Sequence, residues 1–118
     1  MGEVFVEITV ENRHTGAREE QISALVDTGA TLSLLPRSLL ERLGITRTGF
    51  VIGLLADGRE VVREVGDAVI TVNGESTPCR VLFGEAEDAV ILGLTVLEQI
   101  GLAVDPARHR LGAGRFLL

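Results

Sequence analysis

The residues with the clearest chemical potential are an aspartate and the three small residues after it, in the stretch LVDTGAT. Asp27 ends an apolar run, and Thr28, Gly29 and Ala30 follow it directly. Aspartate and glycine at the end of a strand are common in ordinary turns. The same carboxylate could also act as a general acid or base if a second carboxylate lay against it, because two carboxylates in contact share one proton.

No second aspartate of the chain stands in an equivalent setting. Asp57 and Asp105 occur in the turn patterns Asp-Gly and Asp-Pro, and we interpret both as turn formers. One chain would therefore supply half of a carboxylate pair. A C2 homodimer would complete the pair, because an isologous contact can place Asp27 against its own copy at the two-fold axis.

The elements that must position Asp27 are mostly short strands. Asp57-Gly58 and Asn73-Gly74 each predict a hairpin with a two-residue turn. Pro78 places its part of the second hairpin at an edge or a bulge, because proline cannot donate to a strand ladder. The apolar end of the chain, RFLL at 115–118, is also strand-like. Other strands are predicted from hydrophobic periodicity at residues 4–11, 21–26, 89–93, 102–105 and 109–111.

Two short helices interrupt the strands. The first is predicted at 36–43, because Pro36 suits the first helical position. The second is predicted at 94–101, where Thr95 and Glu98 form a capping-box pattern. A glycine follows or ends each helix. The shortage of helices excludes a doubly wound βαβ sheet, so the predicted fold class is mainly β.

A weak internal echo links two parts of the chain. ALVDTGATLSLLPRSLLERLGI and AVILGLTVLEQIGLAVD share the order of apolar strand, glycine-containing turn, short helix, glycine and apolar strand. Two pseudo-equivalent halves within one small β domain would explain the pattern.

Composition limits the classes of partner. The chain has 118 residues, is 46% hydrophobic and carries a net charge of −6, which predicts one folded domain over 1–118. Its arginines are scattered, so nucleic-acid binding is not expected. No apolar run is long enough for a membrane span and no signal peptide is recognisable, so we expect no membrane partner and a cytoplasmic location. The single Cys79 and the two separate histidines give no metal site, and no cofactor is expected.

Three pieces of the chain together resemble the retroviral-type, or retropepsin-like, aspartic proteases and their small single-domain prokaryotic relatives. They are ALVDTGA at 24–30, VILG at 90–93 and the helix LTVLEQIGL that follows. Asp27 and Gly93 are 66 positions apart, and the hairpin around Asp57 lies between them, where the family carries its flap. The resemblance covers nearly the whole chain in order. It implies a single-lobe closed β-barrel or sandwich of hairpins with two short helices, acting as a C2 homodimer.

The resemblance also implies an activity and roles for particular residues. Asp27 would be the catalytic residue of an aspartic endopeptidase, one carboxylate from each subunit, acting on an extended peptide or protein substrate. Apolar pockets would favour apolar residues on either side of the cleaved bond. The other implied residues are Thr28, Gly29 and Ala30 in the active-site loop, Leu92 and Gly93 as its support, Leu25, Ala89 and Ile91 in the substrate pockets, and Leu54, Leu55 and Ala56 in the flap.

The chain departs from the retroviral pattern at three places. Thr31 and Leu94 stand where those enzymes have an aspartate and an arginine that pair and tie the dimer. The dimer must then be held differently, for example by interleaved RFLL strands. The tip sequence LLADGRE lacks the glycine-rich character of the family's flap.

Two alternatives stay open. The same fold could be a catalytically idle dimeric module that binds extended peptides or a partner. The intact Asp-Thr-Gly argues against such a module, because burying two carboxylates is costly for a protein that only binds. The chain could also be a domain of a larger polyprotein or receptor, although its start at Met1 and its end at Leu118 favour a stand-alone protein.

Overall fold

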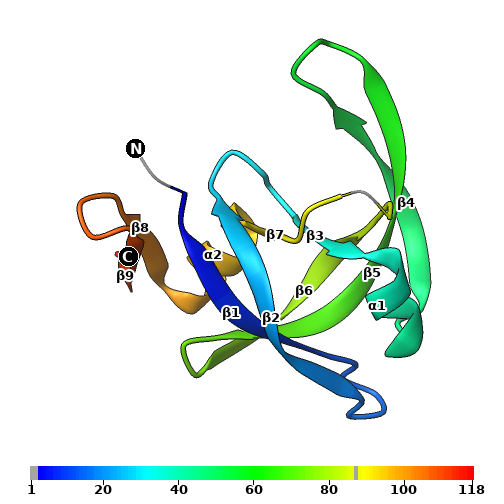
Figure 1. The fold of residues 1–118 in the computed structure, drawn as a ribbon, viewed down its shortest axis with the longest axis horizontal. Coiled ribbons are helices and arrows are strands. Elements are labelled where there is room, and N and C mark those ends of the chain that lie inside the picture. Colours follow the sequence, from blue (N-terminus) through cyan, green and yellow to red (C-terminus); the bar gives the residue numbers. More distant parts are fainter. Residues whose placement is uncertain (1–2, 87) are drawn as a thin grey trace.

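The computed structural model of the protein describes residues 3–86 and 88–118. The fold is mainly β, as the sequence predicts, and Figure 1 shows the strands wrapping into a barrel with two short helices beside it. In chain order the elements of the described residues are β1 (Phe5–Glu11), β2 (Arg18–Asp27), β3 (Ser33–Pro36), α1 (Arg37–Arg42), β4 (Arg47–Leu54), β5 (Glu60–Val72), β6 (Glu75–Gly84), β7 (Ile91–Gly93), α2 (Leu94–Ile100), β8 (Leu102–Asp105) and β9 (Arg110–Ala113).

Six strands close the barrel. The large sheet has the order β1-β2-β7-β3-β6-β5-β4, and β1 also pairs with β5, which joins the ends of the row that runs from β1 to β5. Closure removes the unpaired edges that an open sheet presents. β4 lies outside the ring and pairs only with the first half of β5. These two segments form a hairpin, residues 47–66, that projects from the barrel in Figure 1 and is called the flap hairpin below.

The strand β5 is longer than the sequence suggests. The two hairpin signals predict separate strands, whereas one strand of 13 residues serves both hairpins. Gly66 lies where β5 enters the barrel, and a Cβ there would be 2.6 Å from the Thr46 carbonyl oxygen and 3.0 Å from the Phe83 ring. The absence of a side chain lets the strand cross this crowded point and continue without a break.

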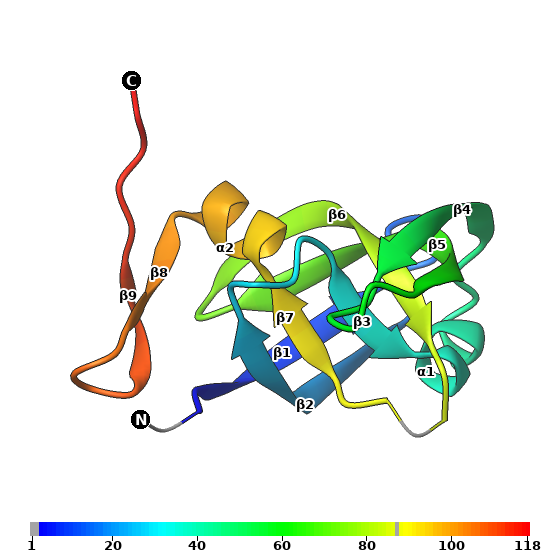
Figure 2. The ribbon, with the colours of Figure 1, turned by 90° about the horizontal axis from the view of Figure 1, so that it is seen from above.

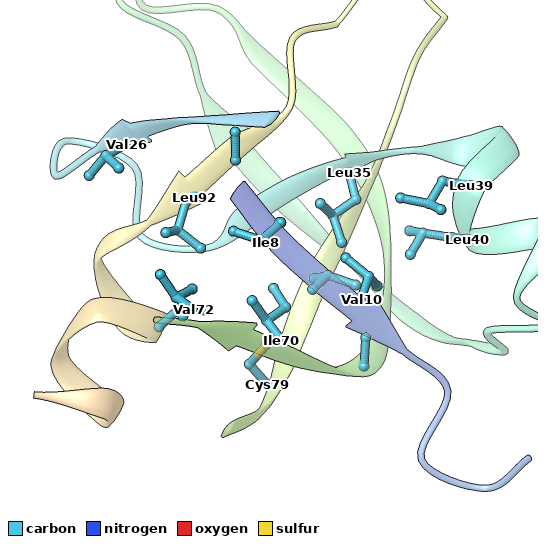
Figure 3. Packing of buried hydrophobic residues seen from close by; sticks show 14 of the residues in the cluster. Ile8, Val10, Val26, Leu35, Leu39, Leu40, Ile70, Val72, Cys79 and Leu92 are labelled. Atoms are coloured by element: carbon cyan, nitrogen blue, oxygen red, sulfur yellow. The ribbon is translucent and has the colours of Figure 1, made fainter. Parts of the chain in front are cut away.

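The barrel interior is an apolar core. Ile8, Leu35, Ile70, Phe83 and Leu92 come from five different strands, and each is fully buried. Figure 3 shows most of these side chains converging with those of α1. The alternation of buried and exposed residues along β1 and β6 is the two-residue period that predicts half-buried strands.

Cys79 belongs to this core. Burial, with a smaller effect from Asp67, raises the pKa of its thiol to about 12. The side chain therefore stays a neutral thiol and packs as a small apolar group.

One of the two predicted hairpin turns is correct. Asn73 and Gly74 both have positive φ, and Val72 pairs directly with Glu75, which is the geometry of a two-residue turn. The hairpin predicted around Asp57-Gly58 is present, but its two-residue turn is wrong, because β4 ends at Leu54 and β5 begins at Glu60, leaving a connection of residues 55–59.

Side-chain hydrogen bonding explains the wider connection. The Arg59 amide donates to Asp57 Oδ1 at 3.0 Å, and the Leu55 amide donates to the Arg59 carbonyl oxygen at 2.8 Å. These bonds hold Asp57 and Arg59 in the turn rather than in the strand ladder.

The edge position predicted for Pro78 is confirmed. Pro78 pairs with Val69 of β5, whereas the pairing of β6 with β3 begins only at Val81. At Pro78, β6 therefore pairs with a strand on one side only, so the amide donor that proline lacks does not interrupt a strand ladder.

The capping box predicted for the second helix is wrong. The N-cap of α2 is Gly93, and no side chain caps it. The first amides of the helix find other partners: Leu94 donates to the Ala30 carbonyl oxygen at 2.8 Å and Thr95 to the Thr31 carbonyl oxygen at 3.1 Å. A distant loop thus satisfies donors that local side chains usually satisfy. The first helix begins at Arg37, one residue later than predicted, with Pro36 as its N-cap.

The C-terminal region packs beside the barrel, with Leu111 of β9 buried in the core cluster. β8 and β9 form their own two-stranded sheet, and residues 114–118, called the C-terminal tail below, extend beyond it (Figure 2). The prediction that RFLL is a strand is wrong, since the tail pairs with no strand of the described chain. The internal echo between the two segments is only partly present. In the first segment β3 lies between the loop that contains Asp27 and α1, whereas in the second segment α2 follows β7 directly. Neither helix in the described residues is long and apolar enough to cross a membrane.

Candidate active site

Parallel pairing of β2 with β7 brings the two sequence motifs together. The register places Leu25 against Ile91, Val26 against Leu92 and Asp27 against Gly93. Buried apolar side chains at Val26 and Leu92 fix this register, because a slip by one residue would turn both out of the core. The 66 positions between Asp27 and Gly93 therefore close to a single strand pair.

The loop after β2, residues 27–32, is tied to the start of α2 by its backbone; it is called the Asp27 loop below. The carbonyl oxygens of Ala30 and Thr31 accept from the first two amides of α2. Thr31 and Leu94, two of the three departures from the retroviral pattern, lie at this junction. Main-chain hydrogen bonds join the segments there, with neutral side chains at both positions.

Gly93 allows the close approach of the two segments. A Cβ at this position would lie 2.6 Å from the Leu32 carbonyl carbon, 2.7 Å from the Leu32 oxygen and 3.0 Å from the Ala30 oxygen. All three are backbone atoms, so no side-chain movement could relieve the clash. The support predicted for Leu92 and Gly93 thus has a geometric basis: a buried side chain and a position that only glycine fits.

Asp27 itself is exposed on the single chain. The Gly29 amide donates to Asp27 Oδ1 at 2.9 Å, and the Ala30 amide donates to the Asp27 carbonyl oxygen at 3.1 Å. A Cβ on Gly29 would lie 3.2 Å from the same Oδ1. The loop therefore holds the carboxylate by one backbone donor and leaves the space beside it free.

Two of the hollows beside the Asp27 loop bear on the predicted pocket and flap residues. One, of about 410 Å³, is lined by Asp27, Thr28 and Leu25 together with Val4 and Val104. The other, of about 500 Å³, lies between the loop and the flap hairpin and is called the flap groove below. Its lining residues are Gly29, Ala30, Thr31, Leu32, Val51, Ile52, Gly53, Leu54 and Leu82.

The flap hairpin covers this groove with one of the predicted flap residues and with three others. Of the predicted residues Leu54, Leu55 and Ala56, Leu54 lines the groove, whereas the other two lie in the tip connection. Val51 and Gly53 are half-buried, in contrast to the exposed Phe50, Ile52 and Leu54. The alternation in FVIGL contains this signal, since residues two apart share one face of a strand.

Two of the three predicted pocket residues lie on neighbouring strands, and the third lines neither hollow. Leu25 and Ile91 are neighbours on β2 and β7, and Leu25 lines the hollow beside Asp27. Ala89 is exposed in the segment before β7 and lines neither of the two hollows. Leu82, which the sequence did not single out, lines the flap groove.

Ser33 is a further residue that sequence reasoning missed. It is buried at the start of β3, and its Oγ accepts a hydrogen bond of 2.9 Å from the Gly93 amide. The bond crosses 60 positions of sequence, so local pattern gives no sign of it. Ser33 is the side-chain link between the Asp27 loop and β7.

Replacing Ser33 by alanine is expected to destabilise this junction. The Gly93 amide would be left buried without a partner, which costs about 1–3 kcal/mol. Thermal unfolding should therefore shift down by several degrees. Ser76→Ala is the matched control, because its hydroxyl bonds to Thr71 on the exposed surface, and a change there is expected to stay within about 0.5 kcal/mol.

The remaining aspartates considered in the sequence serve their own turns. Asp57 accepts from the Arg59 amide, and Asp105 accepts from the amides of Ala107 and Arg108. Across residues 3–86 and 88–118 no group of three or more histidine, cysteine, aspartate or glutamate side chains is arranged to hold a metal ion.

Comparison with known proteins identifies the family. The family model described as gag-polyprotein putative aspartyl protease matches residues 16–99. This range runs from the β1–β2 turn through α2, so it contains the Asp27 loop, the flap hairpin and β7. The chain belongs to this retropepsin-like aspartic protease family. A search of curated proteins found no match.

Proposed function

We propose that the protein is an aspartic endopeptidase that acts as a C2 homodimer and shares one site between two Asp27 carboxylates. The observation that carries the proposal is the exposed carboxylate on a loop locked against Gly93. Hydrolysis by a carboxylate pair needs two such groups, and one chain supplies one. Residues 1–118 would form one half of the site.

In the dimer the two Asp27 carboxylates would meet at the two-fold axis. Like charges in contact repel each other, so the pair would share one proton. The ionised carboxylate would take a proton from a bound water, and the protonated one would donate to the carbonyl oxygen of the substrate. The water oxygen adds to the carbonyl carbon, and the carboxyl that took the water proton would then donate it to the leaving nitrogen as the C–N bond breaks.

The neighbours of Asp27 would serve the pair and the substrate. Thr28 would hydrogen-bond to the loop of the second copy, as the family pattern implies. The carbonyl of Gly29 would accept from the substrate main chain, and Ala30 would keep the approach open. An extended peptide in the flap groove would pair by main-chain hydrogen bonds, in the manner of an added strand.

The C-terminal tail supports a second copy on this face of the molecule. Thr28 of the Asp27 loop and Phe116 and Leu117 of the tail line one hollow of about 450 Å³. Leu117 and Leu118 are fully exposed on the single chain. Clusters of exposed apolar side chains mark protein contacts, so a partner that covers the tail would lie close to the Asp27 loop.

The distribution of charge favours a second copy of this chain as that partner. Residues 105–118 contain three of the eleven arginines but one of the seventeen acidic residues. The rest of the chain is therefore strongly acidic. Attraction between the arginines of residues 105–118 in one copy and the acidic residues of the other copy would guide their association.

Removal of residues 114–118 is expected to convert the dimer to a monomer and to abolish activity at low protein concentration. The apolar contact of the tail would be lost, while the barrel keeps its core. Light scattering at a chain concentration of roughly tens of micromolar measures the molecular mass. Val62→Ser, which removes an exposed apolar side chain of the flap hairpin, should leave the mass unchanged. A dimer that survives the truncation would rule out the tail as its contact.

Cleavage of casein and of a peptide library between pH 4 and 7 tests the proposed function directly. The expected result is cleavage with a preference for apolar residues on both sides of the bond, and specific activity that rises with protein concentration as dimers form. A favoured polar flank would contradict the apolar pockets. Tight peptide binding without cleavage by a dimer would favour the idle binding module instead.

A further inference from the structure

A single carboxylate joins the base of the flap hairpin to helix α1. Glu64 lies in the flap portion of β5, directly opposite Phe50 of β4. Its Oε1 accepts from Arg37 Nη1 at 2.8 Å, and its Oε2 contacts Arg47 Nε at 3.0 Å. Arg37 is the first residue of α1 and Arg47 the first residue of β4. Both oxygens of Glu64 are thus occupied, each by a different element.

A second carboxylate closes the network. Arg47 Nη2 donates to Glu41 Oε2 of α1 at 2.8 Å. We call Arg37, Glu41, Arg47 and Glu64 the flap-base clamp. Two arginines and two glutamates alternate in it, so each charge has an opposite neighbour, and a network of this kind holds its geometry better than an isolated surface pair.

The two arginines of the clamp stack on a buried aromatic ring. Phe83 is fully buried, and the guanidinium carbons of Arg47 and Arg37 lie 4.6 Å and 5.9 Å from the centre of its ring. Planar guanidinium groups stack on aromatic faces. The ring also approaches Gly66, where the flap hairpin leaves the barrel. The clamp therefore lies at the root of the hairpin, on an element that belongs to the core.

The rest of the flap hairpin has little to hold it. Beyond the clamp, Phe50, Ile52, Leu54 and Val62 are all more than half exposed. β4 is the last strand of the sheet and has one neighbour, β5. A two-stranded hairpin is marginally stable by itself, so its resting position depends on what fixes its base.

We infer that Glu64 is a positioning residue for the flap: the flap-base clamp ties the hairpin to α1 and sets how it rests over the flap groove. This role rests on the proposed function, in which the flap hairpin closes over a bound peptide. Glu64 does not touch the substrate. It acts by reducing the conformational freedom that the hairpin must give up when the peptide binds.

The charges around Glu64 suit this role under acidic conditions. Hydrogen bonds from Arg37 and then from Arg47 lower the pKa of its carboxyl. The other charged groups at the clamp are Glu41 on α1 and Glu85, whose Oε1 lies 3.5 Å from Arg37 Nη2. A group with a lowered pKa stays ionised until the pH falls through that lowered value, so the clamp persists in mildly acidic solution, where a carboxylate pair is active.

The test compares Glu64→Gln with Glu19→Gln in the full-length protein. Glutamine keeps the size of residue 64 but removes the charge that both arginines share. Glu19→Gln is the matched control. Glu19 of β2 pairs with Arg42 of α1, with 2.9 Å between Glu19 Oε1 and Arg42 Nη2, so this ion pair joins α1 to β2 and lies away from the flap hairpin. Arg47→Lys is a second variant that keeps the cation and loses the fork that reaches both glutamates.

Two measurements are made on each variant. Amide hydrogen exchange of residues 50–63 reports the freedom of the hairpin, and the kinetics of peptide cleavage report its use. Glu64→Gln is expected to speed exchange in this segment several-fold and to raise KM at least about threefold with kcat within about twofold. Arg47→Lys should shift both readouts in the same direction, and Glu19→Gln should match the wild type.

Each other outcome is decisive. Unchanged exchange in Glu64→Gln, faster exchange without a change in KM, or an equal effect of Glu19→Gln would overturn the positioning role. If the wild type cleaves no peptide, the proposed function fails, and hydrogen exchange alone then decides whether the clamp holds the hairpin.

Discussion

Asp27→Asn is expected to abolish peptide-bond cleavage while leaving the fold intact. Asparagine has nearly the same shape, and its carbonyl oxygen can still accept the hydrogen bond from the Gly29 amide. It can neither take a proton from water nor supply the shared proton, so the rate should fall by about a thousandfold or more. The measurement is hydrolysis of casein or a peptide library between pH 4 and 7, with circular dichroism as the check on folding. Equal cleavage by both proteins would exclude Asp27 as the catalytic residue.

Mixing the two proteins separates a shared site from a site within one chain. If each active site takes one Asp27 from each copy, a mixed dimer has one carboxylate and is inactive. An excess of Asp27→Asn added to a fixed amount of wild type should then suppress activity as subunits exchange. A site within one chain would be indifferent to the added mutant. Mass measurement of differently labelled subunits confirms that exchange has taken place.

The same substitution is expected to strengthen the dimer, although it abolishes cleavage. Two carboxylates held in contact oppose association, because each disfavours the charged form of the other. Asparagine removes this repulsion, so the Asp27→Asn dimer should dissociate at a lower concentration than the wild type. Light scattering over a dilution series measures the difference.

Gly93→Ala is expected to have the largest effect on the stability of the site. The new Cβ would meet the Leu32 carbonyl carbon at 2.6 Å and its oxygen at 2.7 Å. The backbone of the Asp27 loop would have to move away from β7, which strains the pairing of Asp27 with Gly93 and the hydrogen bond to Ser33. Overpacking of this kind costs about 1–3 kcal/mol, and we expect the upper end because every contact is with backbone.

The readouts for Gly93→Ala are the free energy of unfolding in urea and the cleavage rate. Gly112→Ala is the control, because the nearest atom to a Cβ there is Asp105 Cβ at 4.0 Å, an ordinary contact. Gly112 does not have a positive φ, so alanine fits its backbone as well. Equal stability of the two variants would show that the Asp27 loop moves more freely than its contacts imply.

The local elements were largely predictable from the sequence. Alternation predicted β1, Asn73-Gly74 predicted the tight turn between β5 and β6, and Pro36 predicted the start of α1 to within one residue. These features depend on residues within a few positions of one another, where steric and hydrogen-bonding preferences act directly.

Two of the differences from the sequence prediction have a common cause, which is that distant segments took over what local residues were expected to do. The capping box of α2 failed because the Asp27 loop supplies carbonyl oxygens to Leu94 and Thr95. The short strand β3 went unnoticed because SLLP has no period of its own and is fixed by parallel pairing with β6. The two-residue turn predicted at Asp57-Gly58 failed for a local reason, because the Arg59 amide bonds to the Asp57 side chain within a wider turn at 55–59.

The sequence by itself determined the chemistry that one chain can contribute: one Asp-Thr-Gly-Ala loop, one apolar segment ending in Gly93, and no second aspartate in a like setting. Those are statements about residue types, and side-chain chemistry does not depend on the fold. Only the tertiary structure decided that Asp27 lies beside Gly93, that Ser33 accepts a hydrogen bond from the Gly93 amide, and that Glu64 ties the flap hairpin to α1. These contacts join residues 27 to 66 positions apart, and their geometry arises only when the barrel closes and packs.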